Sequence, residues 1–499
     1  MANFAEVVRA VRQVFRTGRT KTYEWRYTQL SAMLKMMDEN KDRMTAALKK
    51  DLNKNKIESM IMEFNLCRNE LILSMNNLKD WMKPEKVKKE LMNIMDKCYI
   101  KREPYGLVLV LGAWNYPVQL TLLPMIAAIA AGNCVIVKPS EMSEQTAILL
   151  EEIVPKYFDN ECVKVINGGI PETTGLLQER FDYIFYTGNN VVAKIVMAAA
   201  AKNLTPVTLE LGGKSPVYVD RNCDLATVAR RLVWGKFLNA GQTCIAPDYI
   251  MCQSDVQDPL IEEIRKVLID FFTDKPEQSD SFGRIVNGRH FKRVEKLLTG
   301  VKVAVGGVTR EEERYISPTI VRDCKLSDAV MQDEIFGPIL PFYVVRDDKE
   351  AVDFINDREK PLAMYIFSRN QRIIDNFVNN TSSGGMCIND CIMHASMPSM
   401  PFGGVGHSGM GAYHGKFSYD TFSHRRSVMQ RDLKMESVNA LRYPPYTEKK
   451  FGIIKWLTKK SVKRTGIMSF FPLVLCGAIL AFFLKAVGVQ ARWPSLGER

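Results

Sequence analysis

One cysteine stands in a setting that suits a nucleophile. Cys244 lies in the stretch FLNAGQTCIAP (237–247), directly after a glycine and two polar residues. The stretch is apolar upstream and interrupted downstream, which predicts a helix that ends at Gly241 and a thiol on the turn beyond it. Free cysteines are commonly small buried hydrophobic residues, so a chemical role for this thiol depends on the rest of the chain.

Polar side chains follow two apolar runs of the sequence. Asn115, in GAWNYP, follows the glycine-bounded run 106–112. Its amide can donate a hydrogen bond to an oxyanion, or it can stabilise the turn. Lys138 and Glu141, in KPSE, follow the next apolar run, where a ribose or phosphate would bind. The alternative for this pair is a solvated loop.

Two carboxylates lie in apolar surroundings. Glu210 is flanked by leucines in LELGG, at the end of a predicted strand. A buried carboxylate without a partner is costly and has a raised pKa, which suits a general base. The alternative is a carboxylate that accepts hydrogen bonds from nearby backbone N–H groups. Glu334, in EIFGP, offers a second carboxylate two residues before the aromatic Phe336.

The elements that must hold these residues follow from the hydrophobic pattern. We expect strands near 106–112, 134–137, 163–166 and 183–186, with helices near 120–131, from Ser143, near 172–180 and near 190–202. The Ser143 hydroxyl would cap its helix. Alternation of short strands and helices predicts a parallel, doubly wound sheet, which binds nucleotides at the C-terminal ends of its strands.

Two further regions flank this predicted sheet. The first 80 residues show apolar positions at helical spacing, which predicts an amphipathic helical layer with no chemistry of its own. A second α/β stretch runs from residue 206 to about 425. It is expected to hold helices near 224–240 and 257–272, strands near 301–305, 340–345 and 363–367, and a glycine-dense loop at 401–411.

Composition limits the class of protein. A chain of 499 residues is too long for one compact core, so two or three domains are expected. Lysine and arginine exceed the acidic residues by 68 − 56 = 12, but no nucleic-acid signature accompanies them, so no nucleic-acid partner is expected. Eleven scattered cysteines favour free thiols in a reducing compartment, and with five histidines a metal site is not expected.

The C-terminal region contains an apolar segment. Residues 466–484 are 19 positions without a charge, and a helix of that length spans roughly 28 Å, close to the ~30 Å hydrocarbon core of a bilayer. We therefore predict a transmembrane helix; the alternative is a buried core helix. Basic residues are denser before the segment than after it, which places the preceding chain in the cytosol. The expected location is an intracellular membrane, the endoplasmic reticulum first and the peroxisome as the alternative.

Several motifs together resemble the aldehyde dehydrogenase superfamily. They are GAWNYP (112–117), KPSE (138–141), FYTG (185–188), LELGGKSP (209–216), GQTC (241–244), EIFGP (334–338) and PFGGVGHSGMG (401–411). They occur in the family's order, and the resemblance runs from about residue 20 to 445. The short N-terminus, the RYPP ending (442–445) and the apolar tail are similar to the membrane-bound members of the class 3 branch.

The resemblance implies an α/β architecture with several parts. The expected parts are N-terminal helices with a doubly wound Rossmann-type NAD-binding domain (1–208), an α/β catalytic domain (209–425), a return segment to the cofactor and oligomerisation region (426–445), a basic linker (446–465), the transmembrane helix (466–484) and a short tail (485–499). It also implies a homodimer.

The resemblance also implies roles for individual residues. Cys244 would be the nucleophile and Glu210 the general base, and Asn115 would form the oxyanion hole together with the Cys244 backbone N–H. NAD would be the cofactor: Lys138 and Glu141 would hold its adenosine ribose, Thr187 and Gly188 would approach its pyrophosphate, and Glu334 and Phe336 would position its nicotinamide ribose and ring. The substrate would be a long-chain, lipophilic aldehyde, oxidised to an acid through a thiohemiacetal and a thioester.

Two other functions remain as alternatives. A thiol hydrolase or acyltransferase without a redox cofactor would need a Cys–His pair, and it leaves the predicted cofactor residues without a purpose. A non-catalytic, membrane-tethered protein on an enzyme fold would be expected to have lost motif residues. Asn115, Glu210 and Cys244 are all present, which favours the oxidoreductase.

Overall fold

A computed structural model describes residues 4–434 and 436–460 of the chain. The predicted transmembrane segment 466–484 and the tail 485–499 lie outside the described residues. Within the described residues, no helix combines the length and the apolar character needed to cross a membrane. The chain divides into two compact units, residues 1–86 with 99–427 and residues 87–98 with the chain from 428 onward.

The first unit contains a six-stranded sheet in the order β17-β7-β6-β3-β4-β5. Its strands are β3 (Leu107–Leu111), β4 (Cys134–Lys138), β5 (Val163–Val165), β6 (Tyr183–Thr187), β7 (Val207–Glu210) and β17 (Gly409–Met410). All pairings are parallel except that of β17 with β7. Every residue of β3, β4 and β6 is buried, as expected for strands covered on both faces. The four strands predicted first are confirmed.

The strand order of this sheet reverses next to β3. From β3 the chain moves to β4 and β5 on one side, and then returns to β6 on the other side. In open α/β sheets, ligands bind outside the C-terminal ends of the strands at such a reversal. The loops after β3 and β6 are therefore the place to look for a site.

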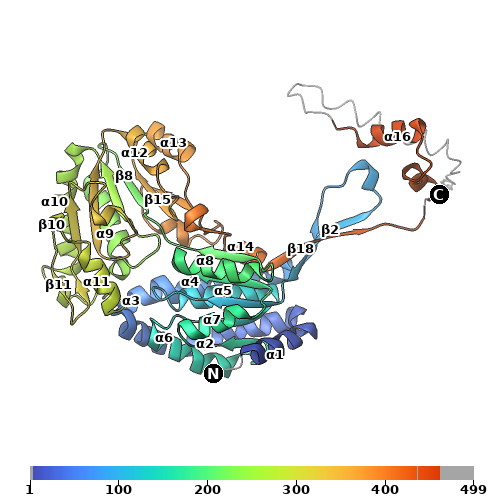
Figure 1. The fold of residues 1–499 in the computed structure, drawn as a ribbon, viewed down its shortest axis with the longest axis horizontal. Helices are drawn as coiled ribbons and strands as arrows, with labels where there is room; N and C mark the ends of the chain where they lie inside the picture. Colours follow the sequence, from blue (N-terminus) through green and yellow to red (C-terminus); the bar gives the residue numbers. More distant parts are fainter. Residues whose placement is uncertain (1–3, 435, 461–499) are drawn as a thin grey trace, which may run out of the picture. The chain divides into compact units, whose positions relative to one another are not determined.

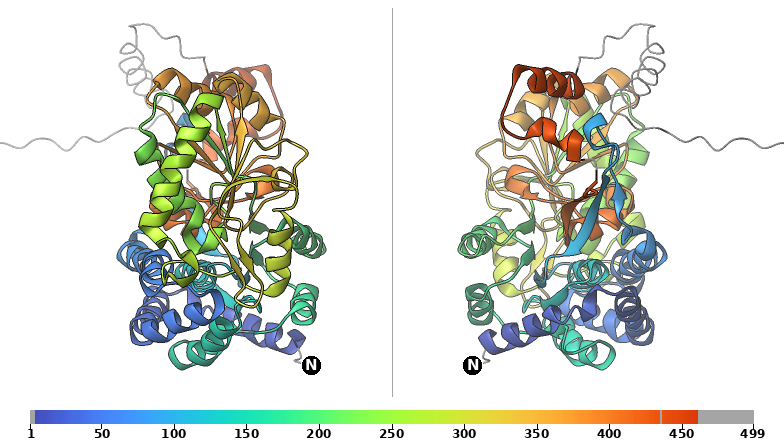
Figure 2. Two further views of the ribbon diagram at one scale, coloured as in Figure 1. Left: turned by 90° about the vertical axis from the view of Figure 1, so that its left-hand side faces the viewer. Right: turned by 90° about the vertical axis from the view of Figure 1, so that its right-hand side faces the viewer.

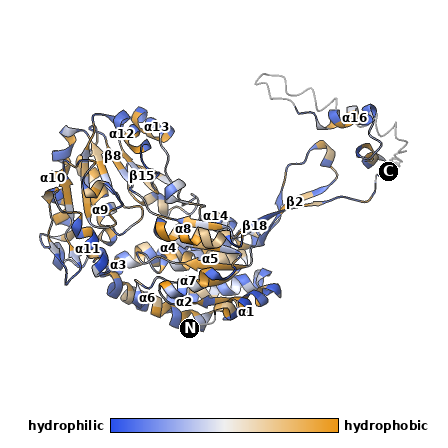
Figure 3. Ribbon diagram, viewed as in Figure 1, coloured by the Kyte–Doolittle hydropathy of each residue, from blue (hydrophilic) through white to orange (hydrophobic). Residues whose placement is uncertain are grey.

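Helices surround this sheet. They are α1 (Phe4–Arg16), α2 (Tyr23–Leu52), α4 (Asn65–Trp81), α5 (Gln119–Ala131), α6 (Glu144–Tyr157), α7 (Ile170–Gln178) and α8 (Asn190–Ala201). The long helix α2 packs against α4, α5 and α6, and the N-terminal helices gather with α6 and α7 at one end of the unit (Figures 1 and 2). Helix α5 is buried from Leu120 to Ala131 and is coloured largely hydrophobic in Figure 3. The predicted helical layer is confirmed.

A second sheet of seven strands has the order β10-β13-β14-β9-β8-β15-β16. Its strands are β8 (Pro216–Val219), β9 (Tyr249–Cys252), β10 (Lys302–Val305), β13 (Thr319–Arg322), β14 (Ile339–Val344), β15 (Ala363–Phe367) and β16 (Gly385–Ile388). Helices α9 (Leu225–Phe237), α10 (Ser254–Phe272), α11 (Gly288–Lys296), α12 (Asp348–Asn356) and α13 (Gln371–Asn380) accompany it. The sequence predicted β10, β14 and β15 but not the other four, each of which is only four residues long.

The predicted end of the helix before Cys244 is wrong. Helix α9 ends at Phe237, four residues before Gly241. Asn239, Ala240 and Gly241 all have left-handed backbones, with φ of 51°, 53° and 76°. An α-helix cannot continue through such residues. The physical reason is side-chain bonding: the Asn239 amide donates to the Asn115 carbonyl of the loop after β3 and to the Gln242 carbonyl of its own turn. A short 3-10 helix at Leu238–Gly241 takes the place of further α-helix.

The second unit is built from segments far apart in the sequence. Arg431 pairs with Asp96 at 2.6 Å, and Lys460 pairs with Glu90 at 2.9 Å. The predicted linker 446–465 contains a helix, α16 (Glu448–Thr458), with no buried residue. Strands β1 (Glu85–Lys86), β2 (Lys97–Pro104) and β18 (Ser423–Gln430) form a three-stranded sheet, most of whose residues belong to the first unit.

Candidate active site

Six of the predicted site residues lie at one edge of the six-stranded sheet. Lys138, Thr187 and Glu210 are the last residues of β4, β6 and β7, while Asn115, Glu141 and Gly188 lie in the loops after β3, β4 and β6. Because these strands are parallel, their C-terminal ends share this edge.

The register of β6 and β7 adds detail. Thr187 is paired directly with Glu210, and the Gly188 backbone N–H donates to the Glu210 carbonyl oxygen at 3.1 Å. The structure therefore brings together residues that are up to 95 positions apart in the sequence (210 − 115).

The turn that carries Cys244 is joined to the loop after β3. The Asn115 amide Nδ2 donates to the Gln242 carbonyl oxygen at 3.2 Å. The next residue along each segment is also linked, since the Tyr116 hydroxyl and the Thr243 hydroxyl lie 2.7 Å apart. Asn115 is thus hydrogen-bonded to Gln242, which lies two residues before Cys244. This is close to the position that the sequence predicted for an oxyanion donor. An amide has two N–H donors, and Gln242 occupies one of them.

Glycine at position 241 connects this turn to the EIFGP loop. Gly241 has a φ of 76°, and a Cβ built on it would collide with the Gly337 carbonyl group. A larger residue would be strained by both the backbone angle and the collision. The glycines of the two motifs therefore allow the nucleophile turn and the Glu334 loop to approach closely.

Glu210 is a buried carboxylate without a hydrogen-bond partner. Within the described residues, neither of its carboxylate oxygens accepts a hydrogen bond of ordinary geometry. Burial raises its pKa to about 7, and the neighbouring Cys244 thiol and Thr187 hydroxyl lower that pKa only in part. A carboxylate with a pKa near the working pH can accept a proton in one step and release it in the next.

The thiol of Cys244 is not pre-ionised. Burial raises its pKa well above the ordinary value, and the negative charges of Glu210 and Glu334 raise it further. Its own backbone N–H lowers the pKa but does not outweigh these effects. No histidine among the described residues is hydrogen-bonded to this thiol. The facing carboxylate of Glu210 is therefore the base available to take its proton.

Glu334 and Phe336 approach the same region from the second sheet. Burial raises the pKa of Glu334 to about 8, with a further rise from Asp248. Its carboxylate lies against Gly212, where an added Cβ would collide with it. The Phe336 ring meets the Trp114 ring edge-on, with 5.2 Å between the centroids. Since Trp114 precedes Asn115, this aromatic pair borders the loop after β3.

The KPSE loop holds a charged pair. Lys138 Nζ donates to the Pro139 carbonyl at 2.8 Å and lies 3.1 Å from Glu141 Oε2. The lysine is buried and the carboxylate is half-exposed. A ribose hydroxyl could reach Glu141 from solvent, whereas Lys138 is held in place by its own loop.

The predicted cap of helix α6 is wrong. The Ser143 hydroxyl donates to the Trp114 carbonyl at 2.6 Å and makes no bond to the helix. Asp51 accepts from the first backbone N–H groups of the helix instead, from Gln145 at 3.0 Å and Thr146 at 2.9 Å. A carboxylate has two oxygens and can accept both bonds, and its negative charge is stabilised near the positive end of the helix dipole.

The residues at the sheet edge fit a nicotinamide dinucleotide. The edge combines glycine-containing turns at the strand reversal, a lysine–carboxylate pair and an aromatic pair. The Thr187 hydroxyl beside Gly188 is buried next to the Glu210 carboxylate and makes no hydrogen bond of ordinary geometry within the described residues. A buried, unpaired hydroxyl at a strand end is available to a ligand.

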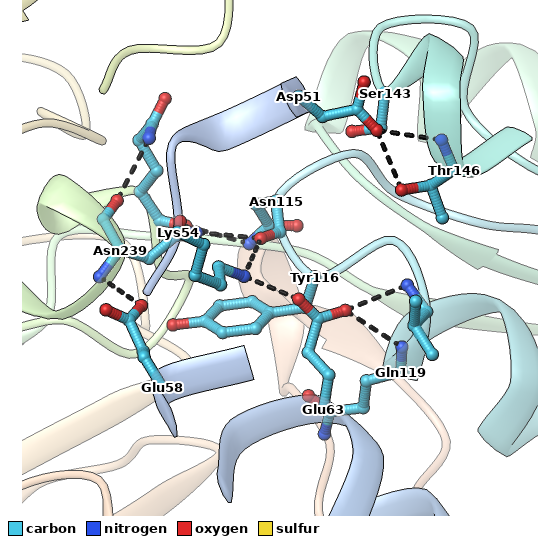
Figure 4. A network of polar contacts seen from close by, with 12 residues as sticks. Asp51, Lys54, Glu58, Glu63, Asn115, Tyr116, Gln119, Ser143, Thr146 and Asn239 are labelled. Carbon is cyan, nitrogen blue, oxygen red and sulfur yellow. Dashed lines mark hydrogen bonds and ion pairs between the residues drawn. The ribbon is translucent and has the colours of Figure 1, made fainter. Parts of the chain in front are cut away.

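Several residues near the site were not predicted from the sequence. Lys54 and Glu63 form a fully buried ion pair that reaches the Asn115 loop, and Asn239 bonds both that loop and the nucleophile turn (Figure 4). Their only sequence signal is charged or polar side chains in apolar helical segments. That signal is too common to identify a site.

The fold and the site define a class of enzyme. The chain belongs to the aldehyde dehydrogenase family, whose sequence model matches residues 1–428. It is therefore an NAD-dependent aldehyde dehydrogenase, which oxidises aldehydes to carboxylic acids.

Relatives confirm the class 3 resemblance. The chain is 50% identical to mouse "Aldehyde dehydrogenase family 3 member A2" over 94% of its length and 98% of the relative's. It is 51% identical to mouse "Aldehyde dehydrogenase, dimeric NADP-preferring" over 89% and 98%. The substrate-bound structure of Staphylococcus aureus AldH shares 42% identity with a TM-score of 0.90, over 92% of this chain and all of that one.

Proposed function

We propose that this enzyme oxidises long-chain, lipophilic aldehydes with NAD, using Cys244 as nucleophile and Glu210 as general base. One observation carries the assignment of roles: a buried carboxylate with a pKa of about 7 faces the Cys244 thiol, and the Asn115 amide is hydrogen-bonded to Gln242, two residues before that thiol. The same three residues are those that the family resemblance assigns.

The chemistry follows from these groups. Glu210 takes the proton of Cys244 as the sulfur adds to the aldehyde carbon, which gives a tetrahedral thiohemiacetal with a negative oxygen. The remaining Asn115 N–H and the Cys244 backbone N–H stabilise that oxygen. A bound NAD would supply the hydride acceptor for this carbon and leave a thioester on Cys244. Glu210 releases its first proton to solvent and then takes a proton from the water that attacks the thioester. The carbon–sulfur bond breaks, the acid leaves, and Glu210 returns this second proton to the Cys244 thiolate.

The cofactor residues divide into three places. We assign the adenosine ribose to Lys138 and Glu141, the pyrophosphate region to Thr187 and Gly188, and the nicotinamide ribose and ring to Glu334 and Phe336. The half-exposed Glu141, the unpaired Thr187 hydroxyl and the Phe336–Trp114 contact support these assignments. The domain boundaries at 208 and 425 belong to the same proposal.

The membrane anchor is proposed from the sequence. The uncharged segment 466–484 would span the membrane, and the basic residues before it would keep the enzyme on the cytosolic side. Lysines on and after α16 support this charge distribution: Lys449, Lys450, Lys455, Lys459 and Lys460. We propose the endoplasmic reticulum as the site, and a homodimer in keeping with the dimeric relative.

The function is tested with the full-length protein in detergent. A sixteen-carbon aldehyde and NAD should give reduced cofactor, followed by absorbance, and the matching acid. A three-carbon aldehyde should be oxidised with a lower kcat/KM, because it buries less apolar surface. Acid formation without reduced cofactor would indicate a different reaction. Equal kcat/KM for both aldehydes would contradict the long-chain preference.

The anchor is tested separately. Membranes from cells that express the full chain should retain the enzyme after a carbonate wash, and a chain truncated before Lys459 should be soluble and active on the short aldehyde. Release of the full chain by carbonate would show that the segment does not span the bilayer.

A further inference from the structure

A fully buried ion pair lies directly behind the oxyanion loop. Lys54 Nζ and Glu63 Oε1 are 2.6 Å apart, and both side chains have 0% exposure. Lys54 precedes α3 (Lys56–Ser59), and Glu63 lies in the following helical turn, Met60–Phe64. Both belong to the N-terminal helical layer, which was expected to have no chemistry of its own.

Lys54 and Glu63 both bind the backbone of the loop that carries Asn115. Lys54 Nζ donates to the Asn115 carbonyl at 3.2 Å and lies 4.2 Å from the centre of the Tyr116 ring. The second oxygen of Glu63 accepts from the backbone N–H groups of Val118 at 2.9 Å and Gln119 at 3.2 Å. The pair therefore fixes the backbone from Asn115 to the first turn of α5 (Figure 4).

Asn239 extends the network to the nucleophile turn. Its amide Nδ2 donates to the Asn115 carbonyl at 2.8 Å and to the Gln242 carbonyl at 3.1 Å. Its backbone N–H donates to Glu58 Oε1 at 3.0 Å. The Asn115 carbonyl thus accepts from both Lys54 and Asn239, while the Asn115 amide donates to Gln242.

Stability alone does not account for this arrangement. Removing two charges from water costs several kcal/mol per ion, and well-packed apolar residues in place of a buried ion pair are often as stable or more so. What apolar residues cannot supply is directional bonding to the Asn115 carbonyl and the two N–H groups. An oxyanion donor is effective only when its position is fixed to a fraction of an ångström.

We propose that Lys54 and Glu63 are positioning residues for the oxyanion donor Asn115. They hold its backbone so that the free amide N–H faces the aldehyde oxygen next to Cys244. The inference rests on the proposed function, and in particular on the role of Asn115.

The test is a double-mutant cycle in the full-length enzyme. The pair is replaced by apolar residues, Lys54→Met with Glu63→Leu, both in the wild type and in Asn115→Ala. In the wild-type background kcat should fall about 10–100-fold, part of the effect of losing one oxyanion donor. The KM for NAD should change less than about threefold, because the replacement is expected to weaken transition-state stabilisation and not the binding of NAD. In the Asn115→Ala background the same replacement should cost less than about twofold.

Controls separate positioning from folding. Lys56→Met removes a neighbouring ion pair that is exposed, with Asp42 at 2.8 Å, and it should leave kcat unchanged. Circular dichroism and thermal unfolding check the fold of each variant. If the pair variant does not fold, the nearly isosteric Glu63→Gln enters the same cycle, with a smaller expected loss in kcat but the same dependence on Asn115.

Two outcomes would overturn the proposal. One is an unchanged kcat in a folded pair variant; the other is a loss of the same size in both backgrounds, which would show that the pair acts independently of Asn115. Neither outcome affects the proposed function, which is tested on the wild type by NAD reduction with the long and the short aldehyde.

Discussion

Buried charged side chains lie on two sides of the turn that carries Cys244, and the two sides differ in whether the charges are paired. On one side Glu210 is a buried carboxylate whose pKa burial raises to about 7. On the other side Lys54 and Glu63 are also buried, but they are paired with each other and both make further hydrogen bonds.

This difference distinguishes a residue that suits a proton transfer from residues that hold the site in place. An unpaired buried carboxylate is costly and therefore responds strongly to a nearby proton, which is what a general base requires. A buried carboxylate that is bonded to a cation and to two N–H donors fixes the groups around it. The predictions below test this contrast between the reactive side and the supporting side.

Removing the nucleophile should have the largest effect. Cys244→Ala should abolish aldehyde oxidation, because no covalent intermediate can form, while NAD binding measured by calorimetry should stay near wild type. Cys223→Ala, at another partly buried thiol, is a matched control that should keep its activity. Turnover near wild type in Cys244→Ala would assign the nucleophile elsewhere.

Removing the base should slow both halves of the reaction. Glu210→Gln should lower steady-state kcat by roughly 10²–10⁴, the usual contribution of a general base. Because Glu210 accepts a proton both from the Cys244 thiol and from the attacking water, the first burst of reduced cofactor and the later steady rate should both fall in stopped-flow absorbance. A burst that stays as fast as in the wild type would show that Glu210 acts in deacylation alone.

Substitutions on the two sides should also change the free energy of unfolding in opposite directions. Because burial raises the folded-state pKa of Glu210, its proton stabilises the fold fully below the unfolded pKa of about 4.3, and this contribution is lost as pH rises through about 7. Glu210→Gln should therefore stabilise the enzyme by roughly 1–3 kcal/mol at pH 8 and change little near pH 4.5. Glu63→Ala should destabilise it by about 3–5 kcal/mol, since Lys54 loses its partner.

Denaturant unfolding of the soluble truncated chain at pH 5 and 8 measures both changes, with exposed Glu144→Gln as the control. Stabilisation by Glu210→Gln that is the same at both pH values would mean that the charge is not its source. Unchanged stability of Glu63→Ala would remove the distinction between the two sides.

The reactive side was predictable from sequence, and the supporting side was not. Asn115, Glu210 and Cys244 lie in motifs with a family order, and the hydrophobic pattern predicted the strand before Asn115 and the strand that ends at Glu210. The nucleophile turn could not be predicted, because its left-handed residues depend on the bonds of Asn239 to distant loops. Lys54 and Glu63 look like ordinary helix-surface charges in the sequence, and only tertiary packing buries them.

The smallest expected effect concerns the choice of cofactor. The half-exposed carboxylate of Glu141 can accept a hydrogen bond from a ribose 2′-hydroxyl, but it repels a 2′-phosphate. Lys138 lies 3.1 Å from that carboxylate and offsets part of the repulsion. At an effective dielectric near 20, one charge pair is worth at most about 4 kcal/mol. We therefore expect the wild type to prefer NAD over NADP by a moderate ratio of kcat/KM.

Replacing the carboxylate should reduce that preference. In Glu141→Gln the 2′-hydroxyl keeps a hydrogen-bond partner, the repulsion disappears, and Lys138 is freed from its ion pair. The kcat/KM for NADP should rise about tenfold, or about 1.4 kcal/mol, while that for NAD should fall less than about threefold. Glu144→Gln, an exposed carboxylate three residues on, should leave the ratio unchanged. Equal kcat/KM for both cofactors in the wild type would show that Lys138 outweighs Glu141, and Lys138→Met should then restore the preference for NAD.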